Sequence, residues 1–555
     1  MRHSRWSLSR RTGFNPVLPG VNMRHARRSL VCTGLAAWSI LCTAALARDW
    51  PQWGGSDGRN MVSDERGLPE VFVPGDKRPD NSGIELRTTR NVRWVARLGS
   101  QTCGNPTVAG GRVFVGTNDF AIGDPKYRST RGGLVKCFEE STGKLLWQLV
   151  IPKRETNDPS FNFDQLDLGV CSSPTVEGDR VYLVTNRCEV ICLDVAGMTN
   201  GNDGPVRDEG QYAAGPGKTP VVPGPQDGDV IWRYDMIGQL AVWPQDASNC
   251  SVLIHGDLLY VCTSNGVDRS HDRLPNPLAP SLIVLDKRSG RLVAKDEEKI
   301  GTRTFHGHWS NPSLGQVNGK PLVFFGGGDG VCYAFEALEG VPRGVVGLKK
   351  VWSFDCNPPH YRCKDGKPIP YRSGDSRLRR GNNNDGQFIG PSEIIATPVF
   401  WKNRVYVAIG QDPSHGRGRG MLSCIDATKT GEVTKTAELW RYDKIDRSLS
   451  TVSIADGLLY IADVVGQLHC LDAETGECYW IHETNAQVWG STLVADGKVF
   501  LGTQKSFWVL KAGKEKKVLK EIPLGAPVYN TPVAANGVLY VASQRYLWAV
   551  AATSE

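Results

Sequence analysis

The sequence has few charged residues, no metal-binding or haem-attachment cysteine motif, and no long apolar run beyond its N-terminal region. Charged residues make up 22% of the 555 positions, which disfavours a long coiled coil, and an apolar content of 40% disfavours intrinsic disorder. No Cys-x-x-Cys occurs, so neither a zinc ribbon nor a covalently attached c-type haem is indicated. Beyond residue 47 no stretch is long and apolar enough to span a bilayer, so we expect no integral membrane segment in the mature chain.

The net charge is concentrated at the N-terminus. Lys and Arg number 65 and Asp and Glu 58, but seven of the arginines lie in residues 1–47, which contain no acidic residue. The rest of the chain is therefore electrically neutral and has no general electrostatic footprint for nucleic acid or an anionic membrane.

Residues 1–47 have the pattern of a signal peptide. Arg24, Arg27 and Arg28 precede an uncharged, apolar stretch that ends in Ala45-Leu46-Ala47. A basic start, an apolar middle and a small-x-small end are typical of an export signal, which predicts a periplasmic or extracellular protein. A retained membrane anchor is the alternative, and Met23 is an alternative start.

Thirteen cysteines follow the signal peptide, and an odd number leaves at least one thiol free or paired between chains. Most lie in apolar, strand-like runs, where a cysteine acts as a small buried hydrophobe. Cys356 and Cys363 flank a short segment of an expected loop and are the best candidates for a local disulfide.

The body of the chain contains eight copies of one pattern. Three copies near the C-terminus, which begin at Thr451, Ser491 and Thr531, follow one another at intervals of 40 residues. Each copy predicts a short strand, a tight Gly- or Asn-containing turn and a strand that ends in Phe or Tyr, then a third strand and often a fourth with Trp. The five earlier copies begin at Asn105, Ser173, Ser251, Asn311 and Thr397.

Four strands in about 40 residues indicate a propeller blade, so the fold predicted is an all-β, eight-bladed β-propeller. The last copy ends after its third strand, Tyr546–Val550, and lacks a fourth. Residues 92–98, with Trp94 at the position of the other blades' Trp, are expected to complete that blade and close the ring. The expected organisation is a signal peptide (1–47), an N-terminal extension (48–90) and the propeller (91–555).

The repeated signature, an apolar residue followed by Asp-x-x-[Ser/Thr]-Gly and then Trp, resembles the repeat of the pyrroloquinoline-quinone-like eight-bladed propellers. Asp472-Ala-Glu-Thr-Gly476, followed by Trp480, is the clearest example, and Glu140-Ser-Thr-Gly143, followed by Trp147, is a similar ending. That superfamily includes quinoprotein alcohol dehydrogenases and the outer-membrane assembly lipoproteins. The segment Trp50–Gly58 resembles the entry segment of exported propellers of this type. For a dehydrogenase the resemblance implies PQQ and Ca²⁺ as cofactors, but the chain lacks the adjacent cysteine pair found in many of those enzymes.

Most long connections are expected on one face of the ring, opposite the tight turns between first and second strands. They are residues 118–130, 152–168, 238–247, 265–280, 295–309, 355–394 and 411–420. Residues 196–228 and 337–347 are the exceptions and are expected on the opposite face. Because rigid scaffolds carry binding groups on such loops, we expect the functional site on the long-loop face, over the central channel.

Residues just before the first strands are expected to surround the channel mouth, where amides and indoles suit a polar planar or sugar-like ligand. These candidate ligand-binding residues are Asn105, Ser172, Asn249, Trp309, Asn311, Trp489 and Asn530. The alternative is that they bond one another and channel water.

Two groups of residues in the sequence have side chains that could bind a metal ion. Asn384, Asp385 and Glu393 offer the oxygen ligands that a hard cation such as Ca²⁺ prefers, although a solvated turn is the alternative. His306 and His308 would share one side of an extended segment, but no third transition-metal ligand is evident in the sequence.

The sequence therefore favours an exported, non-catalytic binding or scaffold module whose long-loop face takes a protein, peptide or glycan. A PQQ- and Ca²⁺-dependent dehydrogenase of an alcohol or sugar is the alternative, and assembly scaffolding at the outer membrane is a third reading.

Overall fold

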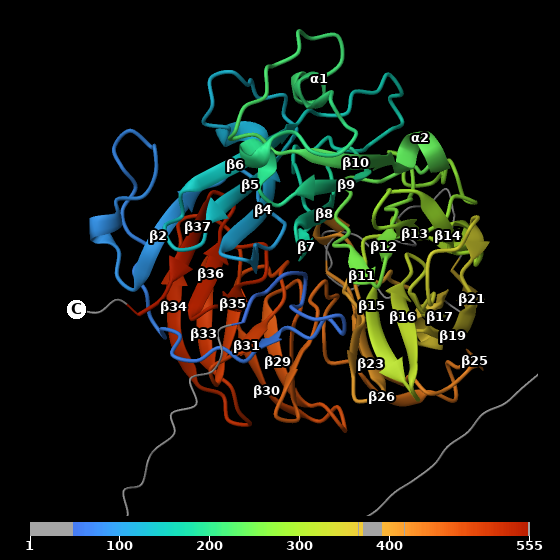
Figure 1. Cartoon of the computed structure of the whole chain (residues 1–555). Coiled ribbons are helices and arrows are strands. Elements are labelled where there is room, and N and C mark those ends of the chain that lie inside the picture. Colours follow the sequence, from blue (N-terminus) through green and yellow to red (C-terminus); the bar gives the residue numbers. More distant parts are fainter. Residues whose placement is uncertain (1–47, 365, 370–390, 416, 553–555) are drawn as a thin grey trace, which may run out of the picture. The chain divides into compact units, whose positions relative to one another are not determined.

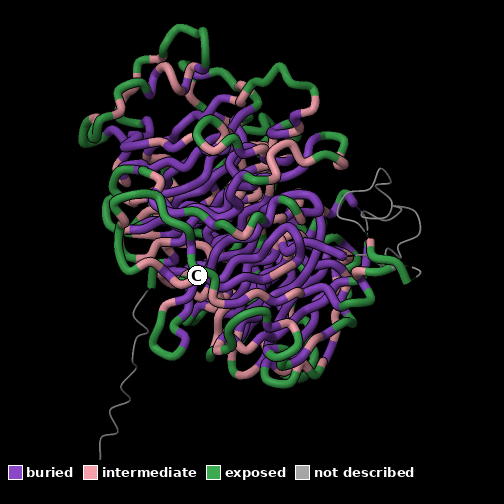
Figure 2. The backbone as a smooth tube through the Cα atoms, turned by 90° about the vertical axis from the view of Figure 1, so that its right-hand side faces the viewer, coloured by how far each residue is buried: buried purple, intermediate pink, exposed green. Residues whose placement is uncertain are grey.

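The computed structural model describes residues 48–364, 366–369, 391–415 and 417–552, which belong to one compact unit. The expected signal peptide lies outside these residues. Eight antiparallel sheets of the described chain form an eight-bladed β-propeller, as predicted, and Figure 1 shows them side by side in chain order. Buried residues lie mainly along the strands, and the exposed ones mainly in the connections (Figure 2).

The first four blades follow one another along the chain. Blade 1 consists of β3 (Thr107–Ala109), β4 (Arg112–Asn118), β5 (Gly133–Glu139) and β6 (Leu145–Ile151). Blade 2 consists of β7 (Thr175–Glu177), β8 (Arg180–Val184), β9 (Glu189–Asp194) and β10 (Val230–Asp235). Blade 3 consists of β11 (Leu253–His255), β12 (Leu258–Cys262), β13 (Leu282–Asp286), β14 (Leu292–Lys295) and the added parallel β18 (Val346–Gly347). Blade 4 consists of β15 (Ser313–Val317), β16 (Lys320–Gly326), β17 (Val331–Glu336), β19 (Lys350–Asp355) and the added parallel β25 (Gly431–Glu432).

The remaining blades complete the ring. Blade 5 consists of β22 (Val399–Trp401), β23 (Arg404–Ile409), β24 (Met421–Asp426) and β26 (Glu438–Tyr442). Blade 6 consists of β27 (Ser453–Ala455), β28 (Leu458–Ala462), β29 (Gln467–Asp472) and β30 (Cys478–Glu483). Blade 7 consists of β31 (Leu493–Ala495), β32 (Lys498–Gly502), β33 (Ser506–Lys511), β34 (Val518–Pro523) and the added parallel β1 (Val62–Ser63). Blade 8 consists of β35 (Val533–Ala535), β36 (Val538–Ala542), β37 (Tyr546–Val550) and β2 (Val92–Arg97).

Short elements decorate the connections. Two helices, α1 (Glu209–Ala214) and α2 (Met236–Leu240), flank β10, and a separate hairpin pairs β20 (Cys363–Lys364) with β21 (Lys367–Pro368). The described 3₁₀ turns are η1 (Leu86–Thr88), η2 (Asp119–Ala121), η3 (Gly197–Asn200), η4 (Ile300–Arg303), η5 (Pro359–Tyr361) and η6 (Pro413–His415).

The ring closes as the sequence predicted. β2 pairs antiparallel with β37, and Trp94 lies opposite Ala549. The Trp94 ring packs 6.0 Å from Tyr540 of its own blade, and its Nε1 donates to Glu140 O of blade 1 at 2.8 Å. The N-terminal strand therefore supplies the fourth strand of the C-terminal blade, so neither end of the repeat leaves an open sheet edge.

Contact between neighbouring blades explains the repeated Gly and Trp. Gly143, Gly290 and Gly476 have φ near +70°, and a Cβ atom on each would lie 2.4–2.7 Å from the indole of the preceding blade's Trp. Those indoles belong to Trp94, Trp232 and Trp440. Only glycine combines this backbone conformation with so close an approach.

A closed ring of hydrogen bonds joins the eight blades around the channel. The residue that opens each copy is Ser, Thr or Asn, and its side-chain oxygen accepts a hydrogen bond from the corresponding residue of the preceding blade. Seven of the donors are backbone amides, and the eighth is the Asn311 side-chain amide. The chain of acceptors runs Asn105, Ser173, Ser251, Asn311, Thr397, Thr451, Ser491, Thr531 and back to Asn105, with distances of 2.7–3.3 Å.

The segment Trp50–Ser63, here called the N-terminal plug, bonds to the first-strand region of every blade. Its backbone bonds to Val108, Val176, Leu314, Phe400 and Val494 at 2.8–3.0 Å, and its side chains bond to Val252 O, Ile454 and Ala534 O at 2.8–3.0 Å. Arg59 is fully buried, and its guanidinium donates to Pro312 O, Val252 O, Trp53 O and the Gln52 side chain. The plug also reaches the tight turns of the hairpins, because Glu65, just after it, accepts from the amides of Asn536 and Gly537.

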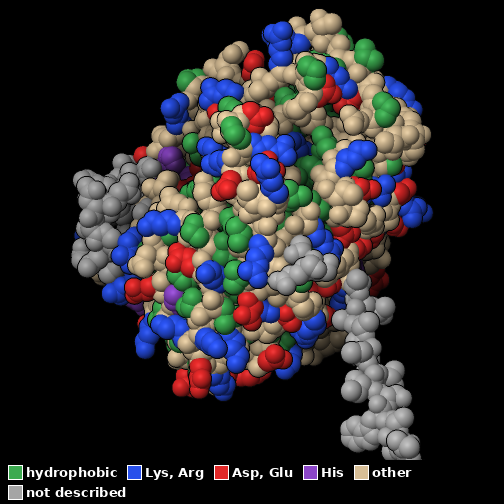
Figure 3. Space-filling view, turned by 90° about the vertical axis from the view of Figure 1, so that its left-hand side faces the viewer, with side chains coloured by type: hydrophobic (Ala, Val, Ile, Leu, Met, Phe, Trp, Pro, Cys, Tyr) green, Lys and Arg blue, Asp and Glu red, His purple; other side chains and the backbone are tan. Residues whose placement is uncertain are grey.

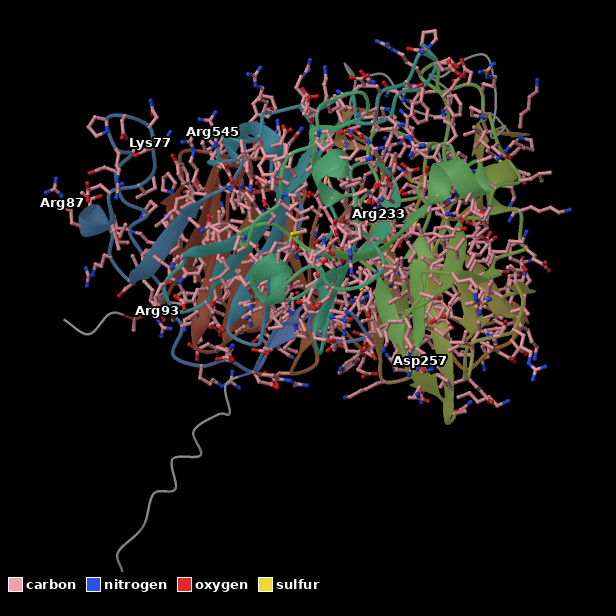
Figure 4. The ribbon with its side chains drawn as sticks, turned by 45° about the horizontal axis from the view of Figure 1, so that its top comes forward. Lys77, Arg87, Arg93, Arg233, Asp257 and Arg545 are labelled. Atoms are coloured by element: carbon pink, nitrogen blue, oxygen red, sulfur yellow. The ribbon has the colours of Figure 1, made fainter. Side chains whose placement is uncertain are left out.

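The rest of the N-terminal extension runs along the outside of the propeller. Figure 4 shows Lys77 and Arg87 on a loop at the periphery, away from the blades. On the face drawn in Figure 3, basic and acidic side chains are interspersed, which agrees with the near-neutral charge of the chain beyond residue 47.

Candidate functional site

Two adjoining cavities lie at the channel end opposite the hairpin turns. The inner one has a volume of about 140 Å³ and is lined by the plug residue Trp53 together with residues that precede the first strands. The outer one has a volume of about 500 Å³. They share Cys103, Cys171, Asn249, Trp309, Ile395, Leu449 and Trp489, so they form one continuous depression. The plug contributes to the lining of the inner cavity, while the long connections line the outer one.

Five of the expected long loops meet in the outer cavity, and Trp309 ends the one that connects blades 3 and 4. Leu166 and Leu168 come from the connection between blades 1 and 2, and Asp246 from the connection between blades 2 and 3. His271 comes from the β12–β13 loop, and Asp412 to His415 come from the β23–β24 loop. The long loops thus surround a cavity on the face where we expected the functional site from the sequence.

The excursion at residues 196–228 extends further than expected. It leaves blade 2 between its third and fourth strands, but Tyr212 Oη in α1 donates to Glu189 Oε2 at 2.7 Å, at the other end of β9. Asp227 accepts from Lys126 and Tyr127 of the β4–β5 loop at 2.6 and 2.9 Å. The excursion therefore packs against a long loop of blade 1.

Six of the seven candidate ligand-binding residues line the inner cavity: Asn105, Asn249, Trp309, Asn311, Trp489 and Asn530. Ser172 does not, because it is fully buried and its hydroxyl donates to Cys250 O at 2.7 Å. Asn105 and Asn311 already use their side-chain oxygens in the ring of hydrogen bonds between blades. That use is structural and accounts for the choice of residue at these two positions.

Several polar atoms of the cavity nevertheless have no hydrogen-bond partner among the described protein groups. They are Asn105 Nδ2, Asn249 Oδ1 and Asn530 Oδ1, each buried beside the inner cavity. Trp489 stacks on Tyr529, with ring centroids 4.5 Å apart and planes 18° apart, and both rings line the same space. The inner cavity thus offers one amide donor, two amide acceptors and a flat aromatic wall.

Three histidines gather in the wall of the outer cavity. His306 lies with its ring centroid 4.7 Å from that of His271 and 4.6 Å from that of His415. One ring nitrogen from each of the three can be chosen so that all three lie within 4.8 Å of one another. His306 and His415 are buried, and His271 is partly exposed. Sequence reasoning singled out His306 but missed the other two; the available signal was one histidine on each of two loops assigned to the same face.

His308 does not join this cluster. Its Nε2 lies 2.8 Å from Thr304 Oγ1 and 3.1 Å from Ser281 Oγ, and its Nδ1 accepts from Gly328 N at 3.0 Å. Complete burial lowers its pKa to about 3, so the ring is neutral. His306 and His308 therefore do not share one side, because the His308 ring lies buried between Ser281 of blade 3 and Gly328 of blade 4.

Carboxylates surround His306. Asp246 Oδ2 lies 3.9 Å from its Nε2, and Glu393 Oε1 lies 3.9 Å from its Nδ1. Burial, together with repulsion from Asp412, raises the pKa of Asp246 to about 7. Burial also raises the pKa of Glu393, although Gly307 N donates to its Oε2 at 3.2 Å. Glu393, expected as a cation ligand, thus lies behind His306; its expected partners Asn384 and Asp385 lie outside the described residues.

The cysteines differ from expectation in one respect. Cys356 is fully buried in the core beneath blade 4, whereas Cys363 is exposed, and both are free thiols, so the expected local disulfide is not formed. The short loop between them directs one side chain inward and the other to solvent.

In the cavity, a hydrogen bond from the Cys171 thiol lowers the pKa of Cys103, so two cysteines far apart in the sequence lie side by side.

Comparison with known proteins assigns the chain to a family. The sequence profile of the outer membrane protein assembly factor BamB family matches residues 123–343 and 418–514. The chain belongs to the BamB family. Its repeats and its eight blades also make it a member of the pyrroloquinoline-quinone-like propeller superfamily. No curated protein matches the sequence.

Three solved structures are among those similar to this chain. BamB from Moraxella catarrhalis is 13% identical, with a TM-score of 0.47 over 82% of this chain and 96% of that one. Quinohemoprotein alcohol dehydrogenase from Comamonas testosteroni is 15% identical, with a TM-score of 0.41 over 91% of this chain and 81% of that one. The computationally designed Ika8 protein is 12% identical, with a TM-score of 0.43 over 82% and 98%.

Among the described residues, no helix combines the length and the apolar character that crossing a bilayer requires.

Proposed function

We propose that the protein is an exported binding module that receives an extended peptide segment of a partner protein in the outer cavity. The observation that carries this proposal is the composition of the cavity wall. Leu166, Leu168, Ile395 and Leu449 give it an apolar lining, and its volume of about 500 Å³ matches sites that enclose a few side chains. Membership of a family described as assembly factors of outer membrane proteins supports a protein partner.

The polar groups of the wall favour a peptide over a glycan. A sugar needs many paired donors and acceptors, whereas the outer cavity combines polar side chains with the aliphatic side chains of Leu166, Leu168, Ile395 and Leu449. Asp246 and Asp412 would accept hydrogen bonds from a Lys or Arg side chain or from a peptide N-terminus. The expected ligand is therefore an extended segment with apolar side chains next to a basic group.

Selection from a library of displayed linear peptides tests the proposal. Wild-type protein should enrich segments of that composition, and Leu449→Arg should weaken their binding at least tenfold because it places a charge in the apolar wall. Val518→Arg is the matched control, since Val518 is 40% exposed on β34, outside both cavities. Peptides that bind both variants equally, or a glycan array that yields ligands where peptides do not, would refute the proposal.

A PQQ-dependent dehydrogenase is the second candidate, and the charges of the cavity disfavour it. The quinone carries several carboxylates, but no Lys or Arg is among the described residues that line either cavity, and Asp246 and Asp412 would add like charge. The residues present do not fit this cofactor. Added PQQ and Ca²⁺ should neither raise the melting temperature nor support dye reduction with alcohols or sugars. A shift together with turnover would establish the dehydrogenase instead.

A further inference from the structure

We infer that His271, His306 and His415 form a binding site for a divalent transition-metal ion, with Zn²⁺ the ion that the ligand set favours. The site depends on the imidazole cluster itself and goes beyond the proposed peptide binding, so either proposal can fail without the other.

The first argument is geometric. The three nitrogen atoms lie within 4.8 Å of one another, and tetrahedral zinc with bonds of about 2.1 Å needs them about 3.4 Å apart. His271 and His415 lie on loops, so small rotations of their rings can close this difference, while His306 holds the third position. The Trp309 ring packs against His306, with centroids 4.9 Å apart and planes at 79°, and restricts the orientation of that imidazole.

The second argument concerns which nitrogen atoms carry lone pairs. His271 Nδ1 lies 3.0 Å from Arg269 O, and because a carbonyl only accepts, that nitrogen carries the proton. The ring lone pair of His271 is then on Nε2, as in metal-binding histidines whose other nitrogen donates to a backbone carbonyl. A backbone contact thus sets the tautomer that a metal ion requires.

The third argument is electrostatic. A doubly charged ion in a partly apolar cavity needs negative charge nearby. Asp246 and Glu393 lie 3.9 Å from the two nitrogens of His306, and Asp412 lines the same cavity, on the loop that carries His415. A cation held by the three imidazoles would lie beside these acidic groups, and its charge would favour their ionised forms.

The ligand set indicates the ion and an open coordination position. Imidazole nitrogen suits Zn²⁺ and other transition ions rather than Ca²⁺ or Mg²⁺, and three histidines leave the fourth position of tetrahedral zinc open. His271 and His415 line the outer cavity. The open position would therefore face the cavity, where a carboxylate, a thiolate or water can complete the coordination.

Metal binding by the chelator-treated, full-length protein tests the inference. Isothermal titration with Zn²⁺ should give one ion per chain, and Co²⁺ should produce the visible absorption of a four-coordinate ion, which added Zn²⁺ abolishes. His271→Ala and His415→Ala should each reduce Zn²⁺ affinity at least about 100-fold. His271→Ala should keep the wild-type melting temperature in chelator, because the His271 side chain is partly exposed.

His255→Ala is the matched control, since it removes another histidine from the hairpin between β11 and β12 at the opposite face and should leave Zn²⁺ affinity unchanged. His306 and His415 are buried, so the loss of affinity in His271→Ala, whose side chain is partly exposed, carries most weight. The absence of stoichiometric binding by the wild type, or equal affinity in a His271→Ala/His415→Ala double variant, would overturn the inference.

Discussion

At the scale of single residues, contacts between neighbouring blades explain the repeat signature. In Asp-x-x-[Ser/Thr]-Gly the glycine adopts a positive φ and supports the flat side of the preceding blade's Trp. The polar residue that opens each copy accepts a hydrogen bond from the preceding blade. Both positions make contacts between blades, so packing of the ring, and not ligand binding, explains which residue types occur there.

Gly476 provides a test with an internal control. It has φ +76° and would place a Cβ 2.7 Å from the Trp440 ring, whereas Gly457 of the same blade has the same φ and no atom within 4 Å of its Cβ. Gly457→Ala should cost about 1–2 kcal/mol for the left-handed backbone alone. Gly476→Ala should cost roughly 2 kcal/mol more because Trp440 must move. Thermal melts of the two variants compare them, and equal losses would remove the packing explanation.

Asp164 predicts a pH dependence of stability. It is buried, and burial raises its pKa to about 7, although Asn186 donates to its carboxylate at 3.2 Å. In the unfolded chain its pKa is about 3.9. Between about pH 4 and 7 the folded state holds a proton that the unfolded state releases, so this group's contribution to stability is present at low pH and is lost as pH rises, by at most about 4 kcal/mol.

Asp164→Asn removes this titration. The melting temperature of the variant minus that of the wild type should increase from pH 4 to pH 7 and then level off. A series of melts in buffers of equal ionic strength measures the difference, and a constant offset would show that Asp164 ionises in the folded protein at its usual pKa.

At the scale of elements, the plug decides which end of the channel is open. It bonds to the first-strand region of all eight blades, and its Trp53 lines the inner cavity. This segment includes the Trp50–Gly58 motif seen in the sequence. The resemblance of this segment to the entry segment of exported propellers therefore reflects a structural part of the ring, with no reacting group required.

Arg59 anchors the plug, so Arg59→Ala should lower stability markedly. The change removes a fully buried guanidinium and leaves the Pro312 and Trp53 carbonyl oxygens without this donor, while Val252 O keeps only the bond from Thr175. The expected loss is about 3 kcal/mol, read as a lower melting temperature and as faster proteolysis before residue 66. Arg233→Ala is the comparison, since Arg233 pairs on the outside with Asp208, which is more than half exposed, and should cost under about 1 kcal/mol. Equal effects would mean that the plug is not held through Arg59.

At the scale of the whole molecule, stability depends on closing the ring. Removal of all residues after Leu524 deletes β35–β37 and leaves β2 without its partner strand. The exposed edges of β2 and of blade 7 should then make the protein aggregate, which light scattering after purification measures. A soluble truncated protein with a cooperative melt would contradict the role of β2.

The sequence by itself determined the number of blades and their strand pattern, because the repeat is visible as local periodicity. It also determined the closing strand, because the last copy lacks a fourth strand and residues 92–98 match one. It also indicated the face on which the long loops gather. The exception was Cys356 and Cys363, where spacing alone suggested a bond that the opposite directions of the two side chains do not allow.

Only the tertiary structure decided the composition of the site. His271, His306 and His415 are far apart in the sequence and meet because three loops on adjoining blades converge over one channel, and no local pattern encodes that convergence. The same holds for the plug, whose partners are spread over the entire ring. Residue pairing within a blade depends on neighbours in sequence, whereas the cavity depends on how the closed ring positions loops from different blades.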